Sequence, residues 1–516
     1  MTIEIVPSVA VGASQFGPIL WTAVAIILTI ISVVLSDARP YPGLKLVGKE
    51  AGEIWNSKAK KRYVEHGVQL MKKAFQDCKG KAFQVIGSNG PIIILPPAMI
   101  NEIRNNPNLS FIDFLKHDFG LKYPGLESWQ GLDHGIFEET VKKRIVSTVG
   151  SLTPIMAEEM SEAADELLPK SKDWTEIKFH HLSLALVSRL TARIFVGESL
   201  CRNQEWLDIS ILYTIKVMSA IRAMRAWPLI LRPFAHRFIP EMRLMRELNE
   251  QANRLLSPHV AIRRRARLEA IQSGNPPPEF KDALGWLDET AGDRPYNVVY
   301  GQLMISLASM HSTSSTLMAL MYHLLENPSY FDMLRQEMVE VLQEHGSLSK
   351  ASLYKLKLLD SCMKESQRLT SVNALSLMRY VHNKVTLSDG TQLPKGSVIA
   401  VPQFHMSDPA NWGPDASKFD GHRFLRMREQ QGNENKWQFV STSPDHYAFG
   451  HGQHACPGRF FASNEIKILM VHLLLKYDWK FKDGQTEQPK SRSDTDFMPD
   501  PEAVILCKER IPEVAF

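Results

Sequence analysis

The sequence predicts a mainly helical protein with small β-sheets, preceded by one N-terminal transmembrane helix. Three observations support this fold class. An apolar stretch without charges lies near the N-terminus, amphipathic helical periodicity runs through most of the chain after it, and hairpin signals are confined to short segments. No repeat or flexible linker divides the chain beyond the apolar stretch. We therefore expect one anchor and one large domain in these 516 residues.

The composition excludes several classes of protein. The chain holds 60 Lys and Arg against 56 Asp and Glu, and a net charge of +4 is too mild to indicate nucleic-acid binding. A mean hydropathy of −0.18 excludes a polytopic membrane protein. Five cysteines in so long a chain exclude a disulfide scaffold and agree with a reducing compartment.

The N-terminal segment predicts a retained membrane anchor. Residues 5–36 contain no Asp, Glu, Lys, Arg or His, and the apolar part, residues 18–36, approaches the roughly 20 residues that a spanning helix needs. A cleaved signal peptide is the alternative. Signal peptides begin with a positive region, whereas this one carries Glu4 and no Lys or Arg, which favours the anchor.

The residues after the apolar segment predict the topology. Arg39, Lys45 and Lys49 follow it, so the positive-inside rule places the rest of the chain in the cytosol. We expect a single-pass protein of the endoplasmic reticulum membrane. Its expected parts are a lumenal tail and anchor over residues 1–36, a Pro/Gly hinge over 37–48 and one catalytic domain over 49–516.

The globular part predicts helices interrupted by two hairpins. Residues 84–95 carry apolar runs around Ser-Asn-Gly, and residues 385–402 alternate around Asp-Gly, both typical of a tight turn between paired strands. An apolar segment from Pro295 to Leu325 predicts one long helix with proline near its first turn. Further helices are expected over residues 97–268, 328–345, 351–370 and 466–475, with Arg263, Arg264, Arg265 and Arg267 on a solvated helix face.

A glycine-rich loop around one cysteine carries the chemistry. In AFGHGQHACPGRFFA, residues 448–462, glycines at 450, 452 and 458 surround Cys456, and an apolar helix follows. Backbone N–H groups and the helix dipole favour a thiolate at such a position. Glycines let the backbone approach a flat ligand closely. The pattern suits a metal-bound thiolate, of which haem ligation by cysteine is one case.

Three other interpretations of this loop stay open on the residues alone. His451, His454 and Cys456 could supply three ligands to zinc. GHGQHA, residues 450–455, fits the dinucleotide fingerprint G-x-G-x-x-A, although the polar stretch before it does not resemble the apolar strand that the fingerprint should follow. A lone cysteine in a glycine turn can also be a buried structural residue.

The whole loop resembles the haem-binding loop of cytochromes P450, F-x-x-G-x-x-x-C-x-G. Phe449, Gly452, Cys456 and Gly458 occupy the four defined positions. The resemblance implies that Cys456 is the axial ligand of the haem iron, with Phe449, Gly450 and Gly458 beside the cofactor. It implies haem b as the cofactor.

Two upstream motifs extend the resemblance. KESQR, residues 364–368, matches the E-x-x-R of the family, and Glu365 and Arg368 share a helix face at a spacing of i and i+3. FDGHRF, residues 419–424, resembles the P-x-R-F segment, in which Arg423 would complete the pair. The expected proline is replaced by Gly421 or His422. These three charged residues are implied to be structural.

The resemblance covers nearly the whole chain and is strongest to fungal microsomal enzymes of secondary metabolism. It implies a cytochrome P450 fold and a haem-thiolate monooxygenase that inserts one oxygen atom from O2 into a lipophilic small molecule, with a terpenoid or indole-terpenoid as the expected substrate. Electrons would come from an NADPH–cytochrome P450 reductase, with cytochrome b5 as a second donor, because the chain has no flavin or nicotinamide domain of its own. The membrane is an expected partner and nucleic acid is not.

The long helix departs from the family pattern (A/G)-G-x-(D/E)-T-(T/S). This chain has ASMHST, residues 308–313, in which Ser309 replaces the glycine and His311 replaces the acid. Ser312 takes the usual threonine position and Thr313 follows. We expect Ala308 to make room at the iron face, and Ser312, with His311 or Thr313, to handle protons. A hydrogen-bonded core histidine is the alternative role of His311.

Basic residues should meet the two haem propionates. His454 stands where most members have arginine, and Arg379 matches the basic residue after the E-x-x-R helix. The usual W-x-x-x-R is not clear, because Trp129 is followed by Asp133. The nearest basic candidates are Lys142, Lys143 and Arg144, for which exposed helix charges are the alternative.

The substrate pocket is expected to draw on four stretches with few charges. By resemblance these are Phe111–Gly131, Met218–Trp227, Met304–Ala308 and Val372–Leu377. RAWPLILRP, residues 225–233, would lie between two lid helices, either dipping into the bilayer or forming a buried turn.

Two further functions remain as alternatives. One is an isomerase or dehydratase on the same fold that acts without a reductase, supported by the missing helix acid. The other is a non-catalytic haem-binding or zinc-binding membrane protein.

Overall fold

The computed structural model describes residue 17 and residues 20–28, 39–120, 123–228, 230–489, 495–497 and 499–516. Residues 20–28 are helical, but most of the expected anchor lies outside the described residues. Within the described part of the chain, no helix is both long and apolar enough to cross a membrane. The transmembrane helix and the lumenal tail therefore stay predictions.

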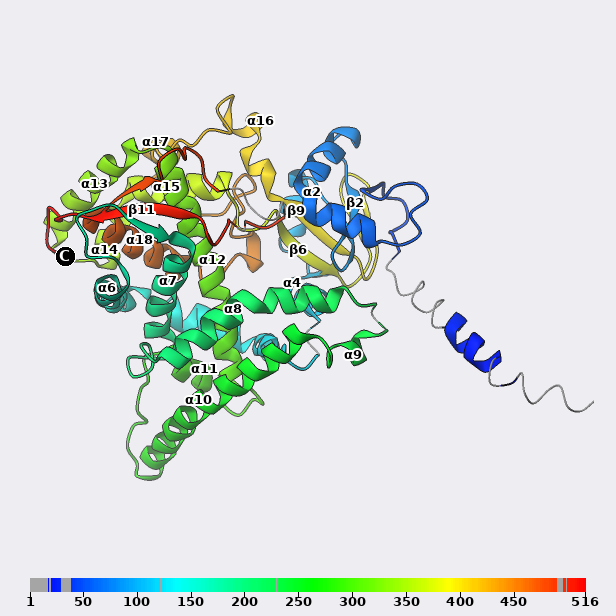
Figure 1. Cartoon of the computed structure of the whole chain (residues 1–516), viewed down its shortest axis with the longest axis horizontal. Helices are drawn as coiled ribbons and strands as arrows, with labels where there is room; N and C mark the ends of the chain where they lie inside the picture. Colours follow the sequence, from blue (N-terminus) through cyan, green and yellow to red (C-terminus); the bar gives the residue numbers. More distant parts are fainter. Residues whose placement is uncertain are drawn as a thin grey trace, which may run out of the picture.

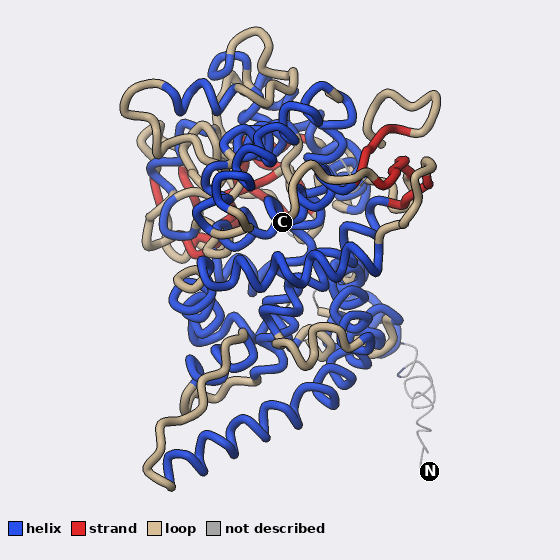
Figure 2. Tube along the Cα trace, turned by 90° about the vertical axis from the view of Figure 1, so that its left-hand side faces the viewer, coloured by secondary structure: helices blue, strands red, loops and turns tan. Residues whose placement is uncertain are grey.

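Helices make up most of the molecule, and the strands gather mainly at one end (Figure 1). The long helix α12, Val298–Glu326, runs through the body, and the two largest clusters of buried apolar side chains both include residues from it. Figure 2 shows a long helix and the loop after it projecting from the body. The mainly helical prediction is confirmed.

The other helices follow in chain order. They are α2 Ser57–Asp77, α3 Ile100–Ile103, α4 Phe111–Phe119, α5 Ile136–Thr140, α6 Val149–Leu167, α7 Phe179–Phe195, α8 Gln204–Arg225, α9 Arg232–Ala235, α10 Pro240–Gln272, α11 Ala283–Ala291, α13 Ser329–His345, α14 Lys350–Lys355, α15 Lys357–Leu369, α16 Pro409–Trp412, α17 Arg423–Glu429 and α18 Arg459–Lys476. Short 3-10 helices are η1 Pro97–Met99, η2 Glu127–Gly135, η4 Gln403–Ser407 and η5 Gly452–His454, and η3 Val141–Ile145 is a short π-helix.

The largest sheet has six strands in the order β1-β2-β3-β9-β6-β4. The predicted hairpin over residues 84–95 is confirmed, because β2 and β3 pair antiparallel around the Ser-Asn turn. β9 then lies parallel to β3 and antiparallel to β6. The strands are β1 Leu46–Val47, β2 Phe83–Gly87, β3 Gly90–Ile94, β4 Leu109–Ser110, β6 Leu375–Val381 and β9 Val398–Pro402.

Two smaller sheets complete the strands. The second predicted hairpin is confirmed only over its first half, where β7, Val385–Thr386, pairs with β8, Gln392–Leu393. The last residues of that segment form β9 and pair in the six-stranded sheet instead, since their side chains are buried there. A three-stranded sheet has the order β10-β11-β5, with β5 Thr175–Lys178, β10 Tyr477–Phe481 and β11 Val504–Glu509.

The start of α12 differs from the prediction. The side chain of Asn297 accepts hydrogen bonds from the backbone N–H of Val299 (2.9 Å) and Tyr300 (3.3 Å), so Asn297 is the N-cap and Pro295 lies before the helix. Asparagine at this position satisfies N–H groups that have no partner inside the helix. The helix is buried around most of its circumference, as its apolar sequence predicts.

The expected single helix over residues 351–370 is two helices. Leu356 leaves the helical conformation between α14 and α15. The carboxylate of Glu337, on α13, accepts hydrogen bonds from the N–H groups of Leu358 (2.6 Å) and Leu359 (3.0 Å). A side chain from another helix thus caps α15, which local sequence does not reveal.

The arginine cluster on α10 is not simply solvated. Arg263 and Arg264 bind Asp282 and Asp288 through charged hydrogen bonds of 2.6 to 2.8 Å. Arg267 binds Glu289 at 3.1 Å. The acidic partners lie on α11 or at its start, so these pairs tie the projecting α10 to the body.

Candidate functional site

The loop before α18 presents Cys456 to the interior. The backbone N–H of Cys456 donates to the carbonyl of Phe449 (2.8 Å), which closes the loop. Arg459, in the first turn of α18, donates to the carbonyls of Cys456 (2.8 Å) and Val440 (3.0 Å). The ring of Phe449 packs edge-on against Phe439, with centroids 5.1 Å apart. The loop is therefore held at both ends.

The glycines of this loop are needed for different reasons. Gly450 and Gly452 have φ of +68° and +82°, a conformation that side chains rarely adopt. A Cβ on Gly452 would lie 2.5 Å from Oδ1 of Asn105. A Cβ on Gly458 would meet no protein atom within 4 Å, so the space beside that residue is open to a ligand.

The protein surrounds the thiol with hydrogen-bond donors. Burial raises the pKa of Cys456, whereas the N–H groups of Gly458 and Arg459 and the charge of Arg459 lower it. These donors can stabilise a thiolate sulfur, but burial opposes ionisation of the free thiol. A bound metal deprotonates a coordinating thiol outright, so the site suits a metal-bound thiolate.

Helix α12 offers one small open face within a mainly buried helix. Ala308 and Ser312 are exposed, although most of their neighbours on the helix are buried. The hydroxyl of Ser312 donates to the carbonyl of Ala308 (2.9 Å). Thr313 is buried beside Glu465 of α18 and does not share this face. Ser312 is thus the predicted hydroxyl that faces open space.

His311 lies against charged groups from two other segments. Burial lowers its pKa; the charge of Asp496 opposes this shift and Arg222 of α8 adds to it. A lowered pKa keeps the imidazole neutral at pH 7, so one ring nitrogen carries a proton that it can donate and the other can accept one. No local sequence pattern predicts that Asp496 or Arg222 lies near this residue.

The three residues of the two upstream motifs meet in a buried cluster. Glu365 accepts two hydrogen bonds of 2.8 Å from Arg368 and one of 3.0 Å from Arg423. Arg368 also donates to the carbonyl of Met406 (3.2 Å). Glu365 and Arg368 are fully buried, so each charge depends on its partners. The cluster joins α15 to the start of α17.

The missing proline of the P-x-R-F segment has a steric reason. Gly421 stands two residues before Arg423, where the family pattern has proline. A Cβ on Gly421 would lie 2.5 Å from the ring of Tyr330 and 2.6 Å from the sulfur of Cys362. Any residue with a Cβ would therefore clash, and the segment still delivers Arg423 to Glu365.

Arg379 is a buried cation that bonds no carboxylate within the described part of the chain. Its side chain on β6 is 3% exposed, its Nη1 donates to the carbonyl of Met378 (2.8 Å), and its Nε has no partner among the described residues. Burial lowers its pKa to about 10. The guanidinium lies 5.7 Å from the ring centre of Phe111, which also neighbours His454 at 6.3 Å. An anionic group is needed here to compensate the charge.

The other basic candidates have surface partners. Lys142 pairs with Glu138, Lys143 with Glu139 and Arg144 with Glu289, and all three are exposed. The structure therefore favours the interpretation as exposed helix charges. Trp129 is buried and stacks on Phe119 at 4.6 Å, and its indole N–H has no partner among the described residues. That unpaired donor is a feature that sequence analysis missed.

Comparison with known proteins decides the family. The family model described as Cytochrome P450 matches residues 135–507. The chain belongs to the cytochrome P450 family.

Several curated P450 monooxygenases of fungi are similar over most of the chain. The monooxygenase adrA of Penicillium rubens is 34% identical over 100% of both chains. The monooxygenase esdpI of Penicillium shearii is 37% identical over 86% of this chain and 88% of its own. Among solved structures, retinoic acid-bound cyanobacterial CYP120A1 superposes with a TM-score of 0.63 at 19% identity, covering 87% of this chain and 96% of that one. The last likeness shows the fold, as expected from the motifs.

The P450 site fits a haem. One thiol lies among backbone donors, Gly458 leaves open space beside it, and the buried guanidinium of Arg379 lacks an anion. Cys456 would bind the iron, and Arg379 with His454 would meet propionates. A thiolate-bound haem supplies O2 activation when it is present, because the thiolate favours O–O cleavage.

The structure does not support the zinc and dinucleotide interpretations of the P450 loop. His451 uses both ring nitrogens, with Arg104 (2.7 Å) and Thr442 (2.9 Å). The described residues contain no group of three side chains that could hold a metal ion, so the zinc interpretation is wrong. Residues 441–447 form turns rather than an apolar strand, so the dinucleotide interpretation is wrong as well.

A cavity of about 1540 Å³ lies next to α12 in this P450. Three of the four expected stretches contribute to it, for example through Phe111, Met218 and Leu375. Met304–Ala308 does not line this cavity, and α12 contributes His311, Ser314 and Ser315 instead. The expectation of few charges is also wrong, because several arginines line the wall.

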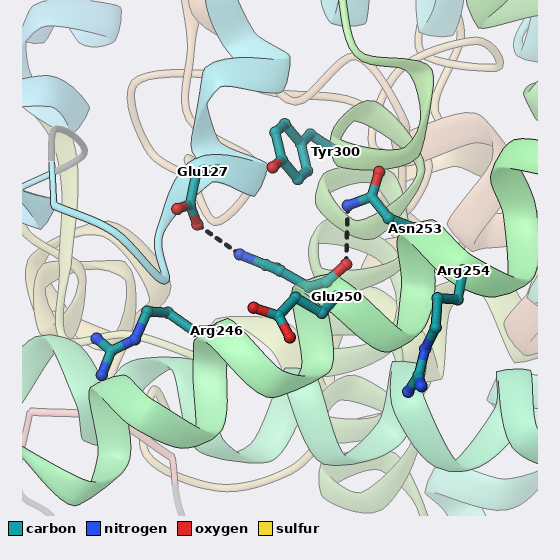
Figure 3. A pocket seen from close by; sticks show the side chains of 7 residues that line it. Glu127, Arg246, Glu250, Asn253, Arg254 and Tyr300 are labelled. Carbon is teal, nitrogen blue, oxygen red and sulfur yellow. Dashed lines mark hydrogen bonds between the residues drawn. The ribbon is translucent and has the colours of Figure 1, made fainter.

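A second hollow of about 650 Å³ lies between α10, η2 and α12. Figure 3 shows its polar lining, in which Glu127 accepts a hydrogen bond of 2.6 Å from Asn249 and the amide of Asn253 donates to the Asn249 carbonyl at 2.8 Å. Arg254 is another lining residue. Cys456, Ala308 and Ser312 do not line this hollow, so it is not the candidate active site.

Proposed function

We propose that this P450 is a haem-thiolate monooxygenase that inserts one oxygen atom from O2 into a lipophilic small molecule of fungal secondary metabolism. The observation that carries the proposal is the cysteine loop: Cys456 lies among N–H donors, and Gly458 leaves an open side next to it. The similarity to fungal P450 monooxygenases over most of the chain supports the same class of reaction.

The residues of this chain divide the work. Cys456 would hold haem b, and the cluster of Glu365, Arg368 and Arg423 joins α15 to the start of α17. Ser312 offers a hydroxyl on the open face of α12, and the neutral His311 can pass a proton from the cavity side. Electrons would arrive from an NADPH–cytochrome P450 reductase, with cytochrome b5 as a second donor, since monooxygenation needs two electrons that no residue here supplies.

We further propose that the protein works at the endoplasmic reticulum membrane, with its catalytic domain in the cytosol. The charge-free N-terminal segment supports an anchor. Four large apolar side chains between α8 and α10 are exposed, which supports a second contact with the bilayer. They are Trp227, Ile230, Phe234 and Phe238.

A terpenoid or indole-terpenoid remains the proposed substrate, on the fungal resemblance alone. The test is expression of the full chain with a fungal reductase in a host that is fed candidate terpenoids, followed by mass spectrometry of the products. Product that gains one oxygen atom, and that requires NADPH and reductase, supports the proposal. Turnover without either would instead establish the isomerase or dehydratase alternative.

A spectrum separates the enzyme from a protein that does not bind haem. The reduced protein under carbon monoxide should absorb at about 450 nm, as a thiolate-ligated haem does. Cys456→Ser should abolish this band. Cys78→Ser should not, because it changes a partly exposed cysteine that is distant from Cys456 in the sequence. Absence of haem in the wild-type protein would contradict the proposal.

A further inference from the structure

The large cavity next to α12 carries more positive than negative charge. Its wall is aromatic where Phe111, Phe114 and Phe119 line it. Its charged lining residues are Arg39, Lys116, Asp118, Arg222, Arg225, Arg232 and Asp496, which are five basic side chains against two acidic ones. A lipophilic neutral substrate gives no reason for this excess.

Arg232 is the most buried of these cations. Its side chain starts α9 and is 7% exposed. Its guanidinium donates to the carbonyls of Trp227 (2.9 Å) and Arg225 (3.3 Å) and to Oδ1 of Asn89 (3.2 Å). All three acceptors are neutral, and burial lowers the pKa of this guanidinium. A buried guanidinium among neutral acceptors is costly unless an anion joins it.

The nearest carboxylate is already engaged. Asp118 receives Arg225 through its backbone carbonyl, at 2.9 and 2.7 Å, and through its carboxylate. Arg225 in turn lies over the ring of Phe119 at 5.2 Å. The pair of Arg225 and Asp118 is neutral, so the positive charge of Arg232 stays in excess at this part of the wall.

The second carboxylate of the wall does not supply the missing charge. Burial raises the pKa of Asp496, and the charges of Arg222, His311 and Arg225 and a hydrogen bond from Thr495 oppose that shift. Arg222 is exposed in the cavity and donates one hydrogen bond, to the hydroxyl of Ser219 (3.3 Å). Asp496 is not among the charged groups that act on the guanidinium of Arg232.

We propose that the substrate is a lipophilic carboxylic acid whose carboxylate binds Arg232 while its hydrocarbon part lies along the aromatic wall. The proposal rests on the proposed function and narrows its substrate class. A guanidinium presents paired N–H donors that match a carboxylate, and desolvation strengthens the contact.

The test compares an acid with its own methyl ester. The full-length holoenzyme is titrated with farnesoic acid, geranylgeranoic acid and the methyl ester of each, by equilibrium dialysis and by the absorbance of the haem. The acid should bind about tenfold more tightly than the ester at neutral pH. Arg232→Gln should remove this preference and leave ester binding within about twofold. Arg254→Gln, which removes a guanidinium from the second hollow, should leave the affinity for both the acid and the ester unchanged.

Two further measurements keep the test decisive if Arg232→Gln does not fold. In the wild-type protein the ratio of acid to ester affinity should fall as salt is added, because the preference is electrostatic. Arg232→Lys, which keeps the charge without the paired donors, should retain part of the preference.

Three results would overturn the inference: equal binding of acid and ester, a preference that survives Arg232→Gln, or binding of neither acid. If the reduced protein under carbon monoxide still absorbs at about 450 nm in these cases, the proposed function stands. If the band is absent, it is the proposed function that fails. The spectrum therefore tells the two failures apart.

Discussion

At the scale of single residues, the buried charge cluster depends on all of its members. Glu365→Gln leaves Arg368 and Arg423 facing each other without a counter-ion. We expect it to lower the free energy of unfolding by about 3 kcal/mol, because a broken buried pair leaves an uncompensated charge. Arg426→Gln removes an exposed pair with Asp420 and should cost less than about 1 kcal/mol. Thermal denaturation of the haem-loaded proteins checks both, and equal losses would contradict the argument.

Gly421 gives a second prediction at this scale. Gly421→Ala places a Cβ against the ring of Tyr330 and should destabilise the fold by about 1–3 kcal/mol. Gly150→Ala, in helix α6, is the matched control, because the added Cβ meets only the flexible side chain of Lys350. It should be neutral or stabilising by up to about 1 kcal/mol. Chemical denaturation measures the difference, and similar effects of the two changes would refute the steric explanation.

The buried side chain of Lys364 should make the stability of the fold depend on pH. It is 1% exposed on α15, and burial lowers its pKa from 10.5 to about 7. Between these two values the unfolded chain binds more protons than the folded one, so this residue makes stability rise with pH. Lys364→Met should remove at least about 1 kcal/mol of that rise. The exposed Lys355→Met should not, and unfolding at neutral and mildly alkaline pH compares them.

At the scale of elements, α15 depends on a cap from another helix. Glu337→Ala leaves the N–H groups of Leu358 and Leu359 without their acceptors. We expect a loss of about 1–3 kcal/mol and faster hydrogen exchange over the first turn of α15. Glu340→Ala, on the same helix α13, is the control and should leave exchange in α15 unchanged. Unaltered exchange after Glu337→Ala would show that the turn is held by other contacts.

Local patterns predicted the elements whose signals are local. The turn between β2 and β3 and the apolar run of α12 are examples. Strand β6 was missed because its register shifts between Ser376 and Arg379, and Leu377 has φ of +49°, which breaks the alternation of side chains. The break before α15 was missed because its cap comes from α13.

The candidate site divides in the same way. The residues around Cys456 follow from one short motif, and Glu365, Arg368 and Arg423 follow from two more. Arg232 and Asp496 could not be predicted as lining one cavity, since only the tertiary fold brings them to the same wall. Thr313 was grouped with Ser312 by its neighbouring position, but the helical rotation turns it to α18.

At the scale of the whole molecule, the exposed apolar residues around α9 predict a second bilayer contact. Figure 1 shows α9 and residues 20–28 toward the same end of the view. In lipid nanodiscs, residues 230–239 of the full chain should exchange hydrogen more slowly than in the double variant Phe234→Glu, Phe238→Glu. Burying each phenylalanine is worth about 1.5–3 kcal/mol.

A control variant makes the membrane prediction specific. Ile511→Glu changes another highly exposed apolar residue, far along the chain. It should leave the exchange of residues 230–239 unchanged. Equal exchange in the wild-type protein and the double variant would count against insertion of this region.

The close approach of Tyr330 to Gly421 also constrains the order in which substitutions can accumulate. In a chain with proline at 421, the proline has to be replaced before an aromatic residue fits at 330. If the aromatic residue comes first, it clashes with the proline and the intermediate protein is unstable. The same rule applies to chimaeras with relatives: grafting a P-x-R-F segment here requires more room at both Tyr330 and Cys362 in the same step.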